Sequence, residues 1–216
     1  MQSMQMFKGI SIQHLKTLSA KLNNSSPRTP QNLDILLAHD AGKAALRRQV
    51  DNQTAPTAFQ FYSTLNKIAL DVASNLSNQI KHPVLSKDLN IAFLFAQYKE
   101  RLGQNRGKIN GTLAKKQLSS LTKQDIASYN AEISLLNQYL LANLDGEQLE
   151  NFSSKLQSAE SRKIETITNS LLNSNSPDFN ALPSASAWFP MATQQISHIK
   201  TLLDSQWITI NREGEE

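Results

Sequence analysis

The stretch KERLGQNRGKING, residues 99–111, decides how the middle of this chain folds. It lies within a long run of helical periodicity, yet it carries three of the chain's seven glycines. Each glycine in a helix interior costs about 0.8–1 kcal/mol relative to alanine. Lys99, Gly103, Arg106 and Asn110 follow one another at steps of four, three and four residues. Because such steps return to the same side of a helix, these four residues form one stripe.

Two interpretations of this stripe are open. A glycine between a lysine and an arginine leaves space between two cations, and donors around a closed space suit a small anion. Alternatively, the glycines serve only close helix crossing and the cations are solvated, as charged helical stripes usually are. Leu102, Ile109 and Leu113 form a neighbouring apolar stripe suited to the core. We therefore expect one helix over residues 88–116, with Gly103 facing another helix.

The rest of the chain has the same helical period. Apolar residues recur every three or four positions, and strand-like alternation is hard to find. Turn-forming residues interrupt the pattern at 25–30, 54–57 and 81–88, and a polar loop spans 173–187. About seven helices are predicted, several of them longer than 20 residues. We expect an all-α fold in a single domain over residues 1–216, with long antiparallel helices forming one or two associated four-helix bundles.

Short sequence patterns predict two further helix starts and the burial of two aromatic residues. Thr122 followed by Asp125 resembles a capping box and predicts a helix start. The same spacing in DGEQ, residues 145–148, predicts either another helix start or a kink. Trp188 and Phe189 follow the polar loop and begin the last helix, so both are expected to be largely buried.

The amino-acid composition excludes several classes of protein. With 39% hydrophobic and 19% charged residues, the chain resembles a folded globular protein. No apolar run approaches the roughly 18 residues of a membrane span, and the first residues lack the pattern of a secretory signal. The absence of cysteine excludes disulfides, thiolate metal sites and a cysteine nucleophile. We expect a cytoplasmic protein that does not bind membranes.

The charged and histidine residues give no sign of nucleic-acid binding or catalysis. The net charge is +4, but the basic residues are scattered and no aromatic residues interleave with them. The four histidines lack ligand spacing with carboxylates, and no phosphate loop or nucleophile elbow occurs. We therefore expect no direct nucleic-acid binding, no metal, no cofactor and no enzymatic activity.

Three segments together resemble a known family. KERLGQNRGKINGTLA (99–114) is similar to the KE-x-x-G-x-x-R-(small)-x-x-N motif of NIT domains, the nitrate- and nitrite-sensing helical domains of bacterial regulators. SASAWFPMATQQISHIKTLL (184–203) resembles their closing W-F-x-x-(A/M)-T-x-x-I-x-x-(I/L)-K helix. LRRQVDNQ (46–53) is similar to an early R-x-x-(T/V)-D segment. Order and spacing agree over residues 45–207.

The resemblance implies two associated four-helix bundles with a ligand held by arginines between helices. Arg106 falls on the arginine of the first motif and Arg47 on that of the early segment. With Gly103 and Lys99, they are the expected ligand-binding residues.

Two other family positions differ in this chain. NIT domains usually open with a helix containing E-R-G, whereas HLKTLSAKLNNSS stands here, with Lys16 and Lys21 as its cations. Asn169 occupies a position, some 19 residues before the Trp-Phe pair, where an arginine is common; Arg162 lies two turns earlier.

By resemblance, the expected function is a signal-input domain that binds nitrate or nitrite and transmits binding by helix rearrangement. NIT domains are coupled to antiterminator modules, chemoreceptor domains, kinases or cyclases, and so to transcription regulation and other outputs. Only NREGEE follows Ile210, so we expect a lone sensor or a piece of a longer regulator, acting on an output domain or partner protein. A homodimer is an open alternative. The competing function is a ligand-free helical scaffold that acts by protein–protein contact.

Overall fold

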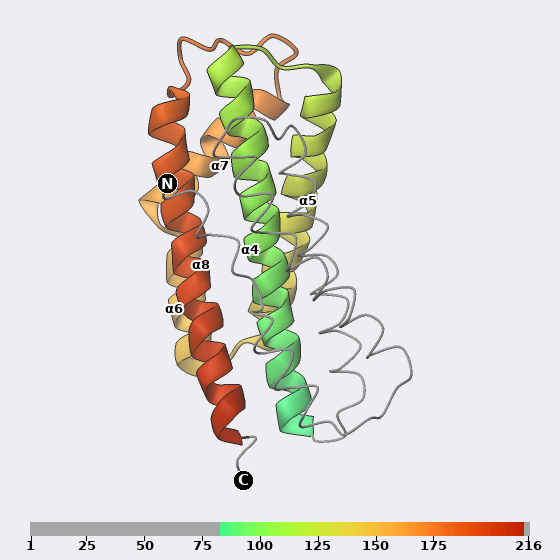
Figure 1. The fold of residues 1–216 in the computed structure, drawn as a ribbon, viewed down its shortest axis with the longest axis vertical. Helices are drawn as coiled ribbons and strands as arrows, with labels where there is room; N and C mark the ends of the chain where they lie inside the picture. Colours follow the sequence, from blue (N-terminus) through green and yellow to red (C-terminus); the bar gives the residue numbers. More distant parts are fainter. Residues whose placement is uncertain (1–82, 214–216) are drawn as a thin grey trace, which may run out of the picture. The chain divides into compact units, whose positions relative to one another are not determined.

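A computed structural model describes residues 83–213 of the chain, and these residues form an all-α structure (Figure 1). No strand occurs within this range. The all-α prediction is therefore confirmed. The described helices are α4 (Pro83–Lys115), α5 (Ser120–Asn143), α6 (Gly146–Leu156), α7 (Ala159–Leu172) and α8 (Ala185–Glu213).

The helix predicted over residues 88–116 is present as α4, which begins five residues earlier. Pro83 is its first residue, a position where proline is tolerated because the missing N–H has no partner within the helix. The three glycines do not break it. Leu102 and Ile109 on its apolar stripe are both buried, and their packing offsets the weak helix propensity of the glycines. Lys116 ends the helix with a left-handed backbone, at φ 49°.

The start of α5 differs from the prediction by three residues. Ser119, not Thr122, is the N-cap: its hydroxyl accepts a hydrogen bond from the backbone N–H of Thr122 at 3.1 Å. Ser119, Ser120 and Thr122 all carry hydroxyl groups that could cap a helix. Ser119 is the N-cap because its backbone is extended and α5 begins at the next residue. The DGEQ segment does start a new helix, since α5 ends at Asn143 and α6 begins at Gly146.

A break between α6 and α7 was not predicted. Ser158 caps α7 by accepting a hydrogen bond from the backbone N–H of Ser161 at 3.1 Å. The polar loop is confirmed, since α7 ends at Leu172 and α8 begins at Ala185. The last helix contains Pro190 and continues to Glu213.

Residues Gln97–Thr209 form a compact unit, and the other described residues belong to a second unit. Within Gln97–Thr209, Arg101 pairs with Glu132 and Lys108 with Asp125. As the numbers rise along α4 they fall along α5, so these two helices are antiparallel. The helices predicted before residue 83 lie outside the described residues, and the number of bundles and the single domain stay predictions.

The core of this unit draws on four helices. Side chains from α4, α5, α7 and α8 pack into one apolar cluster, which fixes the faces that these helices turn toward one another. No described helix has the length and apolar character needed to cross a membrane. The buried members of the cluster are Ile109, Leu113, Ile126, Ile164, Ile167, Leu171, Trp188 and Ala192.

Candidate functional site

Arg106 lies buried between α4 and α8, with only 5% of its surface exposed. Its Nη1 donates a hydrogen bond to Thr193 Oγ1 at 2.8 Å. The guanidinium carbon lies 4.3 Å from the centre of the Phe189 ring, a cation–π contact. Burial lowers the pKa of Arg106, because removing the guanidinium from water disfavours its charged form. Two side chains of α8 thus fix the orientation of a desolvated cation on α4.

Trp188 links the start of α8 to the turn of α4 that contains Arg106. Its Nε1 donates a hydrogen bond to the backbone oxygen of Arg106 at 3.1 Å, and 1% of its surface is exposed. The prediction of a buried Trp188 is therefore confirmed. Phe189 is partly buried, and its ring lies against the Arg106 guanidinium. The two motifs, more than 80 residues apart, meet at Arg106.

Lys99 is the second buried cation of the stripe, also 5% exposed. Its pKa is lowered to about 8, first by burial and then by the positive charge of Lys200 on α8. Lys200 in turn forms an ion pair with Asp204. Lys99 interacts with Lys200 and Arg106 with Thr193, so the numbers fall along α8 as they rise along α4. These two helices are therefore antiparallel; Arg106 contacts α8, and Lys99 lies near enough to α8 for the charge of Lys200 to lower its pKa.

Gly103 lies between these two cations on the stripe and is partly buried. A Cβ atom built on it would have no atom of the described chain within 4 Å, apart from its own helix turn. The expected close contact between Gly103 and a facing helix is therefore wrong for the described residues. What the glycine leaves is open space between Lys99 and Arg106.

The other cations of the opening stretch belong to a different side of α4. Arg101 pairs with Glu132 of α5 and lies 5.8 Å from the ring centre of Tyr129. Lys108 Nζ lies 2.6 Å from Asp125 Oδ2. These half-exposed pairs stand apart from the buried Lys99 and Arg106, so α4 carries two basic stripes with different surroundings.

Of the remaining predicted cations, Arg47, Lys16 and Lys21 lie outside the described residues. Arg162 and Asn169 are both exposed on α7. Neither takes part in the contacts of Arg106 given above. Within residues 83–213, no cluster of three metal-ligating side chains occurs.

Sequence reasoning assigned no site role to Thr193 or Phe189. Both belong to the closing motif, where the threonine follows the Trp-Phe pair at a fixed distance. A four-residue step from Phe189 places Thr193 on the same side of α8. That spacing was the available signal, and it became meaningful only once the partner helix was known.

Comparisons with known proteins identify the family to which the chain belongs. A family model for NIT, described as nitrate and nitrite sensing, matches residues 10–206. Searches against curated proteins and against solved structures find no significant match. The match covers most of the chain and includes both motifs that meet at Arg106, and the chain therefore belongs to the NIT family of nitrate- and nitrite-sensing domains.

Proposed function

We propose that this protein senses nitrate or nitrite by binding the anion with Arg106 and Lys99 in the space beside Gly103. One observation carries the proposal: two buried cations on one face of α4 flank a glycine whose missing side chain leaves open space. A small anion between two positive charges gains favourable Coulomb energy from both, and this energy is larger away from bulk water.

The chemistry of the cations suits a planar, singly charged oxyanion. A guanidinium is a planar fork that can hold two oxygens of nitrate or nitrite at once. Thr193 and Phe189 restrict the plane of the Arg106 guanidinium, so less rotational freedom is lost when the anion binds. Lys99 contributes a positive charge without a fixed plane.

Arg47 is the second arginine of the proposed site. It lies outside the described residues, and its inclusion rests on its match to the early family segment. A second guanidinium would supply a further planar pair of N–H donors for the anion.

The signal is proposed to arise at the α4–α8 contact. Lys99 and Lys200 repel each other across these helices, and this repulsion contributes to the lowered pKa of Lys99. An anion beside Lys99 offsets this repulsion, so the bound state favours a closer approach of α8 to α4. A ligand shifts such an equilibrium only by its difference in affinity for the two arrangements. An output domain, a partner protein or a second copy of the chain would receive that change.

A thermal-shift series tests the proposal. Nitrate and nitrite are compared with chloride, sulfate, phosphate and small carboxylates at equal ionic strength. A ligand at one hundred times its dissociation constant stabilises the folded state by about 2.7 kcal/mol. We expect Arg106→Ala to abolish the nitrate shift and Arg106→Lys to weaken it strongly, whereas the exposed Arg162→Ala leaves it nearly unchanged.

The alternative function is a scaffold that acts by protein–protein contact without ligand. Equal shifts with chloride and with both nitrogen oxyanions at millimolar levels would establish that alternative and end the sensor proposal. The exposed positions of Arg162 and Asn169 favour neither function.

A further inference from the structure

The exposed side of α5 carries a row of uncharged residues, called here the α5 seam. Its members follow one another at alternating steps of three and four residues, and all of them are exposed. Two are large and apolar, with exposed fractions of 75% for Leu121 and 46% for Leu135. A helix that is apolar on opposite sides is typically buried on both. The seam consists of Leu121, Gln124, Ser128, Ala131, Leu135, Gln138 and Ala142.

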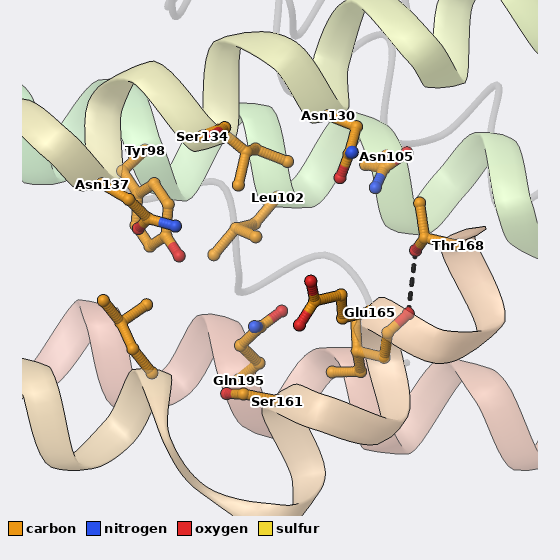
Figure 2. Close-up of a pocket in the computed structure, with 13 residues that line it drawn as sticks. Tyr98, Leu102, Asn105, Asn130, Ser134, Asn137, Ser161, Glu165, Thr168 and Gln195 are labelled. Atoms are coloured by element: carbon orange, nitrogen blue, oxygen red, sulfur yellow. Dashed lines mark hydrogen bonds between the residues drawn. The ribbon is translucent and has the colours of Figure 1, made fainter. Parts of the chain in front are cut away.

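The opposite side of α5 packs within its own chain. Ile126 and Leu140 on that side are fully buried. Asn130, Ser134 and Asn137 line a cavity of about 250 Å³ together with residues of α4, α6, α7 and α8 (Figure 2). No seam residue lines this cavity. The helices of the unit Gln97–Thr209 therefore use one side of α5 and leave the seam to a partner.

The three charged side chains of α5 have partners away from the seam. Asp125 pairs with Lys108 and Glu132 with Arg101, both on α4. Lys123 donates hydrogen bonds to the loop that precedes α8. The chain as a whole carries a net charge of +4, which opposes association of two copies. A contact through the seam adds no further repulsion between like charges.

We propose that the α5 seam is the contact between two copies of this chain, with their α5 helices antiparallel about a two-fold axis at Ala131. In this register Leu121 faces Ala142 of the partner subunit, and Ser128 faces Leu135 of the partner subunit. Each large side chain thus meets a small one, as close packing requires. A two-fold contact needs a surface that is complementary to itself, and the order of large and small residues on the seam meets that condition.

A parallel pairing fits the same residues less well. It would place Leu135 against its own copy and Ser128 against its own copy, so one level is crowded and another is left with a gap. The antiparallel register is therefore the one that the seam favours. The inference does not depend on nitrate binding.

Sedimentation velocity of the full chain over a series of concentrations tests the contact. One pair of helices is a small interface beside the roughly 1,200–2,000 Å² of stable complexes, so we expect a dimer that dissociates on dilution. Ala131→Glu places two carboxylates at the axis and should weaken dimerisation at least tenfold. Because Ala131 is exposed, the variant should keep the helical circular dichroism of the unmodified protein.

Ser170→Glu is the matched control, since it adds the same charge on an exposed part of α7 and should dimerise as the unmodified protein does. A chain that stays monomeric at every concentration would overturn the proposal. A dimer that Ala131→Glu leaves unchanged would overturn it as well.

Single cysteines determine the direction of the two helices, because the chain has no cysteine of its own. A disulfide requires Cα atoms about 4.4–6.8 Å apart, so Ala131→Cys should cross-link to itself under mild oxidation. Leu121→Cys alone should not, since the antiparallel register separates its two copies by about 30 Å. A mixture of Leu121→Cys and Ala142→Cys should cross-link. Self cross-linking of Leu121→Cys, or none by Ala131→Cys, would refute this register.

Discussion

The indole nitrogen of Trp188 donates a hydrogen bond to the backbone oxygen of Arg106, which joins the start of α8 to the middle of α4 across 82 residues of sequence. This bond fixes the turn of α4 from which the Arg106 side chain projects. Phe189 and Thr193 then hold the guanidinium itself. The backbone and side chain of one residue are thus both positioned by the closing motif.

Trp188→Phe tests the hydrogen bond separately from the packing. The variant keeps an aromatic ring but removes the N–H donor and leaves a small part of the indole's space unfilled, so we expect a loss of about 1–3 kcal/mol in unfolding free energy. Trp188→Ala should lose more, about 3–5 kcal/mol. Urea denaturation measures both. Equal stability of Trp188→Ala and the unmodified protein would contradict the buried position of this ring.

Gly103→Ala should separate stability from ligand binding. The added methyl group has no described neighbour within 4 Å, so alanine should stabilise α4 by about 0.5–1 kcal/mol. The same methyl narrows the space between Lys99 and Arg106, so nitrate affinity should fall. Gly111→Ala is the matched control: it also has no described neighbour, and it should raise stability without changing nitrate affinity. Melting curves and calorimetry give the two readouts, and unchanged affinity in Gly103→Ala would place the anion elsewhere.

Lys99 predicts opposite pH dependences for stability and for binding. Its folded pKa of about 8 lies below the ordinary value of 10.5, so between these values the unfolded chain binds more protons. The penalty for burying the ammonium is therefore present in full below pH 8 and is relieved as pH rises toward 10.5. Nitrate affinity should fall over the same rise, because Lys99 loses its charge. Lys99→Met should remove both trends, and identical pH profiles for the variant and the unmodified protein would show that Lys99 has no part in either.

Thr193 should act by positioning Arg106. Thr193→Val keeps the shape of the side chain but removes the oxygen that accepts from Nη1, and hydrogen bonds to charged groups contribute about 1.5–3 kcal/mol. Thr193→Ser keeps that oxygen and should restore nitrate affinity. Calorimetry on the two variants distinguishes them, since a role in packing alone would make the serine variant the weaker binder.

The ion pairs between α4 and α5 should contribute little. Lys108 and Asp125 are about one-third and nearly one-half exposed, and such surface pairs contribute about 0.2–1 kcal/mol. A double-mutant cycle with Lys108→Met and Asp125→Asn measures the coupling. Both variants should keep the full nitrate response, which also makes them charge controls for Arg106→Ala.

The sequence predicted the helices well where apolar spacing was long and regular, as in α4, because periodic burial outweighs the weak propensity of three glycines. It missed the break before α7, where Ser158 takes the capping role in a segment whose apolar period runs on. It also placed the start of α5 at Thr122, because several hydroxyl residues compete there and backbone geometry selects among them. The sequence around residue 119 does not by itself determine that backbone geometry.

For the site, the sequence identified Arg106, Lys99 and Gly103, since one helical stripe contains all three. It misjudged what Gly103 faces, because the distance to a neighbouring helix is set by packing elsewhere along the pair. The roles of Thr193 and Phe189 depend on a contact across more than 80 residues, which helical periodicity cannot indicate. Arg47 lies outside the described residues, and its role stays a prediction.

Pro190 lies in α8 between Phe189 and Thr193, the two residues that contact the Arg106 guanidinium. It follows Phe189 directly and precedes Thr193 by three positions, and it has no N–H to donate to the carbonyl of the preceding turn. The first turn of α8 is therefore joined to the rest of the helix by one backbone hydrogen bond fewer. Bending there requires less energy than elsewhere in α8, so Phe189 and Thr193 can change their separation across the guanidinium while the core beneath stays packed. We therefore expect any bending of α8 to fall at this proline, between the two side chains that contact Arg106.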